Sequence, residues 1–378
     1  MKILTISEVY PDESKPQYGI YIKQQVDRLI SLGNEIDVLL PRRTSTNSNI
    51  KQSEWEGVRV YSMDYRTIRY ELFPSLIARG AYLSIKDLVR QNKYDLIAVH
   101  ITSDTILKIA TDVANELGIK VVAHYHGLNV WSEHVSRHKL RDKWYANRRA
   151  NILRKTNAIV GVSDKVCEIV RQKVDKVPVH TVYNGVETEL FYPQDCKFDN
   201  FTVIGVGNLI SIKGFRYLID AFKKLYDEDS TVRLVIVGEG VERNSLLAKI
   251  SSLGLDEAVT LTGKLPYDEV SQYMRRSHVF VLPSYYEALG CVYLEAMACG
   301  VPTVGVNGMG IDEIIVDGQN GYLCNPRDVD SVYDCIKKVM TSTDFQADLG
   351  MRGRETALKF TWEASAKSLD EVYKSVVR

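Results

Sequence analysis

The chain has 378 residues, enough for two domains with substantial cores. Its 48 Lys and Arg residues balance 48 Asp and Glu residues, so the overall charge gives no signal for a nucleic-acid-binding protein. Hydrophobic residues make up 45% and charged residues 25%, which is ordinary for a globular protein, and no run of about 20 apolar residues predicts a membrane span.

The charge is divided unevenly along the chain. Residues 1–190 carry 28 basic and 22 acidic residues and residues 191–378 carry 20 and 26, so the halves have net charges of +6 and −6. This difference favours an anionic partner for the first half. The six cysteines form no C-x-x-C pair and have no close histidine, which argues against a zinc site and favours reduced thiols in a cytosolic protein.

Strand-like apolar runs alternate with helical patterns through the first half. The chain begins with such a run and not with a signal peptide, because the run is short and Glu8 follows at once. Several runs are almost continuously apolar, as expected for strands that are covered on both faces, and β–α alternation predicts a parallel sheet. The expected strands are 2–7, 35–40, 58–62, 95–100, 120–124, 158–162 and 180–183.

A helix is predicted at 20–32, because Ile22, Val26 and Leu29 recur at helical spacing and Gly33 can end it. Gly19 joins the preceding loop to this helix. A glycine here lets the backbone approach a phosphate or a sugar, although a simple turn glycine explains it equally well.

Two histidines lie at the end of the expected strand at 120–124, in the sequence from His124 to Asn129. The carboxyl end of a parallel strand is where open α/β sheets bind ligands. From the residues alone, His126 is as readily a structural histidine as a catalytic one.

Residues 136–155 form a basic segment with one acid, Asp142, and with Trp131, Trp144 and Tyr145 nearby. A basic helix with aromatic side chains can lie on an anionic membrane or receive a phosphorylated acceptor. A solvated basic face is the alternative, and nucleic acid is disfavoured because no nucleic-acid-binding module accompanies the segment. The eight cations are Arg137, Lys139, Arg141, Lys143, Arg148, Arg149, Arg154 and Lys155.

The alternation breaks at 184–200, where Asn-Gly, Pro193 and a polar stretch predict an interdomain linker. We therefore expect two doubly wound Rossmann-like α/β domains, 1–190 and 191–360, facing each other across a cleft. A final amphipathic helix is expected at about 362–377, and core packing explains it most simply. The expected strands of the second half are 201–207, 233–238, 259–262, 278–282 and 303–306.

The first strand of the second half leads into a glycine-containing loop at 205–214 and then into a helix. This arrangement suits an anion, although the glycine spacing fits neither a dinucleotide fingerprint nor a Walker loop. Lys213, beside Gly214 at the start of the helix, can supply a point charge for a diphosphate. Taken by itself, a surface lysine is the simpler explanation.

Two acids lie in the segment 283–302, with seven residues between them. Glu287 falls in a turn, and Glu295 falls within an apolar helix, where a buried carboxylate needs a partner. The start of this helix, beside Leu289 and Gly290, offers free N–H groups and a positive dipole end that suit a phosphate. An acid beyond it can bind ribose hydroxyls, so we expect a nucleotide sugar across this turn.

With these motifs assembled, the sequence resembles the retaining glycosyltransferases of the GT-B fold, specifically family 4, over nearly its whole length. Glu287 and Glu295 match the family's E-x7-E motif, which is the most specific feature. The segment 206–214 resembles the family's diphosphate loop, His126 its first-domain histidine, and Gly19 its first-domain glycine loop. Weaker matches lie at 161–163, 183–187 and 308–313.

The resemblance implies a role for each matched residue. Glu295 would hold the ribose, Glu287 would lie beside the donor sugar, and Lys213 would bind the diphosphate without a metal ion or other cofactor. His126 would contact the transferred sugar near the reacting carbon, which makes His126 and Glu287 the catalytic candidates. The donor would also contact Gly19, Asn208 and Gly214. Lys264 and Leu265 would meet the nucleobase, and Ala288, Leu289 and Gly290 would line the sugar and phosphates through their backbone.

Three positions depart from the family pattern. Asn208 stands where many members have Arg, so phosphate binding would depend more on Lys213 or Arg216. Leu289 replaces a frequent Phe and Asp312 a frequent Pro. These departures leave the class intact and leave the donor sugar open.

The resemblance implies transfer of a hexose-type sugar from a UDP- or GDP-linked donor to an acceptor hydroxyl, with retention of anomeric configuration. No enzymic nucleophile pair is evident, which favours same-face attack assisted by the leaving phosphate. The pattern from Gly19 through Gln25, with Pro41, resembles that of bacterial cell-wall and exopolysaccharide members. The acceptor is expected to be a saccharide, and contact of the basic segment with a membrane would make it a lipid-linked saccharide. The alternatives are a nucleotide-sugar epimerase of the same fold and a catalytically silent sugar-nucleotide-binding subunit.

Two further expectations concern the chain as a whole. The resemblance implies that the last helix, 361–378, packs back on the first domain. We also expect a cytoplasmic protein that contacts the inner face of the cell membrane through its basic segment, whose membrane- or acceptor-facing residues would be Arg137, Lys139, Arg141, Lys143, Trp144, Arg148 and Arg149.

Overall fold

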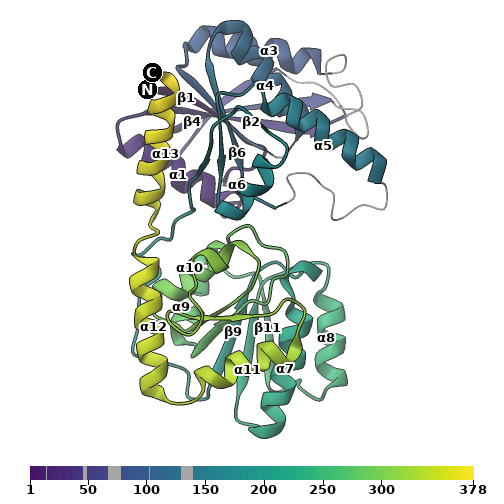
Figure 1. Ribbon diagram of the computed structural model, residues 1–378, viewed down its shortest axis with the longest axis vertical. Coiled ribbons are helices and arrows are strands. Elements are labelled where there is room, and N and C mark those ends of the chain that lie inside the picture. The colour runs from purple at the N-terminus through teal and green to yellow at the C-terminus, as the bar shows by residue number, and fades with distance from the viewer. Residues whose placement is uncertain (14, 46–48, 67–77, 102, 129–138) are drawn as a thin grey trace. The chain divides into compact units, whose positions relative to one another are not determined.

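The chain forms two compact units. Unit 1 comprises Met1–Tyr183 together with Trp362–Arg378, and unit 2 comprises Asn184–Thr361. We expected the divisions after residues 190 and 360. In the structure they fall after Tyr183 and Thr361, so that the segment 184–190 belongs to unit 2. The computed structural model describes residues 1–13, 15–45, 49–66, 78–101, 103–128 and 139–378 (Figure 1).

Unit 1 is built on an eight-stranded sheet with the strand order β3-β4-β2-β1-β5-β6-β7-β8. The pairings are parallel except that of β3 with β4. The strands are β1 (Lys2–Ile6), β2 (Glu35–Thr44), β3 (Lys51–Trp55), β4 (Val58–Arg66), β5 (Leu96–His100), β6 (Lys120–Tyr125), β7 (Ala158–Gly161) and β8 (Val179–Thr181).

Helices flank this sheet (Figure 1). Three of them begin at a hydrogen-bonding or glycine cap: Ser103 caps α4, Ser163 caps α6, and Gly19 precedes α1. The helices of unit 1 are α1 (Ile20–Ser31), α3 (Arg79–Asn92), α4 (Asp104–Leu117), α5 (Lys139–Leu153), α6 (Asp164–Arg171) and α13 (Trp362–Val377).

The C-terminal helix α13 packs beside α1 and completes the core of unit 1 (Figure 1). Leu369 and Tyr373 are almost fully buried in the same apolar cluster as the first strand. Asn34 Nδ2 donates to Asp370 Oδ1 at 2.9 Å, a buried bond between residues 336 positions apart. The last helix is therefore an integral part of the first unit.

Unit 2 contains a second, six-stranded sheet, which is entirely parallel in its described pairings. Its strand order is β11-β10-β9-β12-β13-β14. The strands are β9 (Thr202–Val206), β10 (Arg233–Val237), β11 (Val259–Gly263), β12 (Val279–Val281), β13 (Thr303–Val306) and β14 (Tyr322–Cys324). The helical elements are η2 (Ser211–Lys213), α7 (Phe215–Glu228), α8 (Arg243–Ser252), α9 (Tyr267–Arg276), α10 (Cys291–Ala298), η3 (Gly310–Glu313), α11 (Val329–Val339) and α12 (Thr343–Ala357).

Each unit is therefore a doubly wound α/β layer structure, as the β–α alternation predicted. Two strands were not expected. β3 is a polar edge strand with no buried residue, and β14 has only three residues, so neither carries the apolar pattern that marks a central strand.

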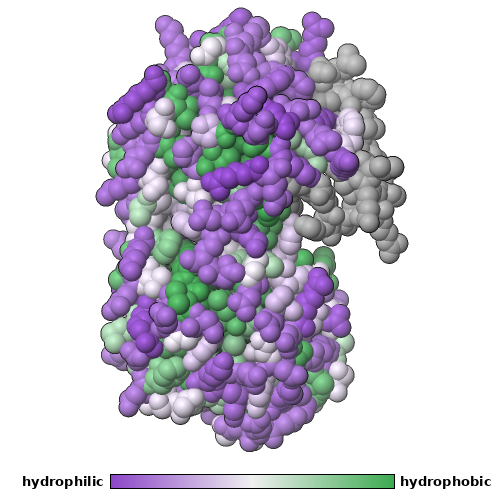
Figure 2. All heavy atoms as spheres, viewed as in Figure 1, coloured by the Kyte–Doolittle hydropathy of each residue, from purple (hydrophilic) through white to green (hydrophobic). Residues whose placement is uncertain are grey.

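Within the part of the chain that the structure describes, no helix is long and apolar enough to cross a membrane. On the face shown in Figure 2, hydrophilic residues dominate the described surface and the hydrophobic residues form small, separate areas.

Candidate functional site

The turn between β12 and α10 brings the two motif acids into different surroundings. Gly290 precedes α10 with φ of 80°, and a Cβ at this position would lie 2.7 Å from the Tyr293 ring and 3.1 Å from Glu287 Cγ. Only glycine fits both that backbone conformation and that space. Ala288 and Leu289 are buried beside it, so their contribution to a ligand site is limited mainly to their backbone.

The glycine-containing loop after β9 is bonded directly to this turn. Tyr285 N and Ser284 Oγ both donate to Ile212 O, at 3.0 and 3.1 Å. Gly214 lies so close to the Pro283 carbonyl that a side chain there would collide with it. The loop and the turn therefore form one rigid substructure at the carboxyl edge of the sheet.

Lys213 and Glu287 meet in this substructure. The Lys213 ammonium forms an ion pair with Glu287 Oε2, and both side chains are less than one-fifth exposed. The sequence predicted both residues in one site, and the structure brings them into contact. The contact also means that an anion approaching Lys213 would compete with Glu287 for the ammonium.

Glu295 is buried one turn into α10, with 7% of its surface exposed. The Tyr267 hydroxyl, at the start of α9, donates to Glu295 Oε1 at 2.5 Å. Burial raises the pKa of Glu295 from 4.5 to about 7, although the hydrogen bond from Tyr267 opposes this rise. The Tyr267 ring in turn packs edge-on against Phe191, with ring centroids 5.1 Å apart.

Sequence reasoning did not identify Tyr267 as the partner that a buried Glu295 requires. The signal was weak: Tyr267 lies only two residues beyond Leu265, a predicted base-binding position, but nothing in the sequence relates it to Glu295.

The remaining predicted donor-binding residues of unit 2 lie at the same edge of its sheet. Asn208 follows β9 and Lys264 follows β11, on either side of β10, and both are exposed, whereas Leu265 is half-buried. Gly207 N donates to Val237 O at 3.0 Å, which keeps the loop after β9 close to the end of β10.

In unit 1, Gly19 and His126 lie close together. Gly19 has φ of 77°, and a Cβ there would be 2.8 Å from the Val9 carbonyl carbon, so two backbone segments meet at this point. Gly19 starts α1, and Tyr21 of that helix packs on the His126 ring with centroids 4.8 Å apart. The two predicted residues of the first domain therefore share one locality.

Three histidines gather at the carboxyl ends of β5 and β6. His100 Nδ1 lies 2.7 Å from His126 Nε2, and the His124 Nε2 atom lies 2.9 Å from the Tyr373 hydroxyl of α13. Burial lowers the pKa of His126 to about 4 and that of His124 to about 3, the latter with a further contribution from His126. The sequence had pointed to His126, but it gave no reason to join it to His100.

The basic segment is divided by the structure. Arg137 lies outside the described residues, and Lys139 and Arg141 belong to the first turn of α5, where only the backbone is described. Arg149 differs from the expectation of an exposed cation, because its Nε donates to the buried Asp104 at 2.5 Å.

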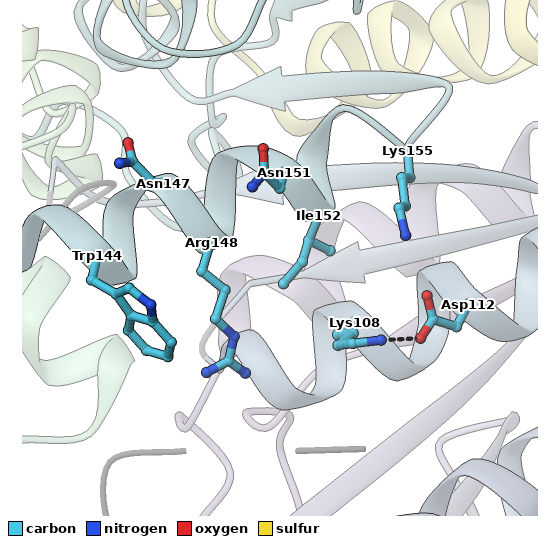
Figure 3. Close-up of a pocket in the computed structure, with 8 residues that line it drawn as sticks. All are labelled: Lys108, Asp112, Trp144, Asn147, Arg148, Asn151, Ile152 and Lys155. Atoms are coloured by element: carbon cyan, nitrogen blue, oxygen red, sulfur yellow. Dashed lines mark hydrogen bonds and ion pairs between the residues drawn. The ribbon is translucent and has the colours of Figure 1, made fainter. Parts of the chain in front are cut away.

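A pocket lies between α5 and α4, within unit 1 (Figure 3). Trp144 and Arg148 extend from α5 toward α4, on which Lys108 pairs with Asp112. Lys143 is exposed on α5, and Trp144 is 47% exposed. The lining residues are Lys108, Asp112, Trp144, Asn147, Arg148, Asn151, Ile152 and Lys155.

Among the described side chains, no group of three or more His, Cys, Asp and Glu residues is arranged to hold a metal ion. At the 283–290 turn, Lys213 and the N-terminus of α10 supply positive charge.

Two family models together match most of the chain. The model described as Glycosyltransferase Family 4 matches residues 19–190, and that described as Glycosyl transferases group 1 matches residues 191–356. The chain belongs to the family 4, group 1 glycosyltransferases. Its 283–302 turn and 205–214 loop both fall in the group 1 region.

Relatives of this chain include glycosyltransferases that match it over all or about half of its length. A putative teichuronic acid biosynthesis glycosyltransferase of Bacillus subtilis, TuaC, is 25% identical over 406 residues, covering 100% of this chain and 99% of TuaC. An N-acetyl-alpha-D-glucosaminyl L-malate synthase of Bacillus anthracis is 29% identical over 221 residues, covering 56% of each.

Solved structures identify the architecture as the GT-B fold. Sucrose-phosphate synthase from Thermosynechococcus elongatus has a TM-score of 0.80 at 21% identity, covering 100% of this chain and 99% of that one. Anabaena HepE, solved in complex with UDP and glucose, has a TM-score of 0.77 at 20% identity, covering 99% of this chain and 100% of that one.

Proposed function

We propose that this glycosyltransferase moves a hexose-type sugar from a UDP- or GDP-linked donor to an acceptor hydroxyl, with retention of configuration and without a metal ion. One observation carries the donor assignment: Lys213, the N-terminus of α10 and the buried Glu295 surround a single turn of unit 2. A cation and free N–H groups suit a diphosphate, and a carboxylate suits ribose hydroxyls.

The chemistry requires stabilisation of the charge that develops on the leaving diphosphate. Lys213 and the N–H groups at the start of α10 would supply it, because both are held in place before the reaction begins. When the diphosphate pairs with the Lys213 ammonium, the ion pair between Lys213 and Glu287 would break, and Glu287 could then face the donor sugar. Retention follows in this scheme from same-face attack, with the leaving phosphate accepting the proton of the acceptor hydroxyl.

The acceptor is proposed to be a saccharide or a lipid-linked saccharide of surface polysaccharide or glycolipid synthesis. The similarity to TuaC supports this class of product. The exposed Lys143 and Trp144 of α5 support a contact with anionic lipid. Co-sedimentation with vesicles that contain anionic lipid should decrease as salt is added, and salt-independent or absent sedimentation would contradict the membrane contact.

A thermal-shift screen over UDP, GDP and their sugars tests the donor assignment, because a selective ligand raises the unfolding midpoint. Lys213→Ala and Glu295→Ala should remove the shift while the protein stays folded. The product's anomeric proton coupling, measured by NMR, then decides between retention and inversion.

Two outcomes would favour the other functions. A new sugar epimer formed from the donor alone would indicate an epimerase. Donor binding without transfer to a broad acceptor panel would indicate a silent binding subunit, which the uncharged Asn208 in the diphosphate loop also favours.

A further inference from the structure

His100, His124 and His126 form a cluster at the ends of β5 and β6. His100 is the register partner of His124 across the two strands, and His126 follows two residues later. The His100 ring is stacked on that of His124 with centroids 4.5 Å apart, and it lies edge to edge with that of His126, with centroids 5.0 Å apart and an interplanar angle of 11°. The three rings therefore hold one another in place.

The bond between His100 and His126 limits how protons are distributed. At 2.7 Å, one of the two nitrogens must carry the hydrogen and the other must accept it. Burial lowers the pKa of both rings, so both are neutral near pH 7 and each carries one N–H group. Once His126 Nε2 is committed to one role, its Nδ1 must take the opposite role.

The other ring nitrogen of His126 is available. Nδ1 is buried and has no hydrogen-bond partner among the described residues. Leaving a buried polar atom unpaired costs about 1–3 kcal/mol, which a substrate group could recover. His100 is only 5% exposed, so it is placed to act on His126 and not on a substrate.

We propose that His100 is a positioning residue that fixes the orientation and the tautomer of His126, so that Nδ1 is the ring atom presented to a sugar hydroxyl. The identity of that ligand rests on the proposed function. The hydrogen bond and the fixed tautomer do not, and they can be tested without a substrate.

The first test is ¹⁵N NMR of the full chain labelled in histidine, which has seven such residues. The His126 signals are assigned by their loss in His126→Gln. In the wild type, His126 should show one protonated and one unprotonated nitrogen. In His100→Phe, which removes the bond, its two nitrogens should move toward averaged shifts. In His100→Asn, whose amide can replace Nδ1, the single tautomer should be retained.

His124 stacks on His100 but is bonded to Tyr373, so its tautomer, as distinct from its exact chemical shifts, supplies an internal control for folding. That tautomer should persist in both variants. If the His126 nitrogens are unchanged in a folded His100→Phe, or already averaged in the wild type, the proposal is wrong. If His100→Phe fails to fold, the wild-type and His100→Asn spectra still test the proposal, because averaged His126 nitrogens in either protein would contradict it.

The second test is a double-mutant cycle with the nucleotide sugar selected by the thermal-shift screen. When His126 is present, His100→Phe should lower kcat/KM about 10-fold or more. When it is added to His126→Ala, it should have no further effect, because His100 acts through His126. Independent, multiplicative losses would overturn the proposal. If no donor is turned over, the proposed function fails, and the NMR result still tests the role of His100.

Discussion

Glu295→Gln should stabilise unit 2 at high pH and have little effect at low pH. The carboxyl group has its pKa raised from 4.5 to about 7 by burial, so its ionisation opposes folding. A raised carboxyl pKa means that the folded state binds more protons between these values, and stability therefore falls as pH rises from 4.5 to 7. Gln does not titrate, and its carbonyl oxygen can still accept the bond from Tyr267.

The magnitude follows from the shift. A difference of 2.5 pKa units corresponds to about 3 kcal/mol of lost stability at pH 8, at about 1.4 kcal/mol per unit. At pH 5 the loss is about 0.8 kcal/mol, because the carboxyl is then mostly ionised in the unfolded chain and still protonated in the folded state. The advantage of Glu295→Gln in unfolding free energy should therefore grow by about 2–3 kcal/mol between pH 5 and pH 8.

Urea unfolding followed by far-UV circular dichroism measures this advantage. Unit 2 contains none of the four tryptophans in its sequence, and Trp55, Trp144 and Trp362 lie in the described part of unit 1, so tryptophan fluorescence separates the unfolding of unit 1 from that of unit 2. An advantage of equal size at both pH values, or a variant less stable than the wild type at pH 8, would refute the reasoning. The same variant should bind nucleotide more weakly, since an amide replaces the proposed ribose-binding carboxylate.

Three more predictions concern separate parts of the molecule. Lys213→Ala should weaken UDP or GDP binding about 10- to 100-fold in calorimetry, as expected for loss of a charge-assisted bond, whereas Lys223→Ala on the exposed side of α7 should not; equal affinities would contradict the role of Lys213. Gly19→Ala should lower stability by more than Gly118→Ala, because both glycines have positive φ but only a Cβ at position 19 meets backbone atoms, and equal losses would argue against that close approach. Unit 1 should lose stability as pH falls from 6.5 to 5, because His124 and His126 become protonated in the unfolded chain but stay neutral in the folded protein. Urea unfolding followed by tryptophan fluorescence should show a loss of about 2 kcal/mol per histidine, and His124→Gln should make the loss smaller. Unchanged stability would contradict the lowered pKa values.

Much of the fold could be predicted because most of the central strands are buried runs with a simple pattern. β5, for example, is buried at every position. β3 could not be predicted this way, since its sequence Lys-Gln-Ser-Glu-Trp has no apolar face and its pairing with β4 supplies the order. A strand held by its neighbour leaves little trace in its own composition.

The candidate site was predictable where one short segment carries it. Glu287 and Glu295 share a turn and a helix, so their spacing alone points to a common site. Tyr267 and His100 were missed because their contacts, to Glu295 and to His126, span 28 and 26 positions and depend on strand order. Arg149 was counted among the membrane- or acceptor-facing cations because the charge of the segment could not reveal its ion pair with the buried Asp104.

The return of α13 to unit 1 has a consequence for how the protein is made. Unit 2 is one continuous stretch, whereas the core of unit 1 lacks Leu369 and Tyr373 until residue 373 has been synthesised. Domains commonly fold in the order in which they leave the ribosome. Here the second unit can complete its core first, while the apolar surface of unit 1 that α13 will cover remains exposed. We expect a chaperone that binds the nascent chain to cover that apolar surface until α13 has been synthesised.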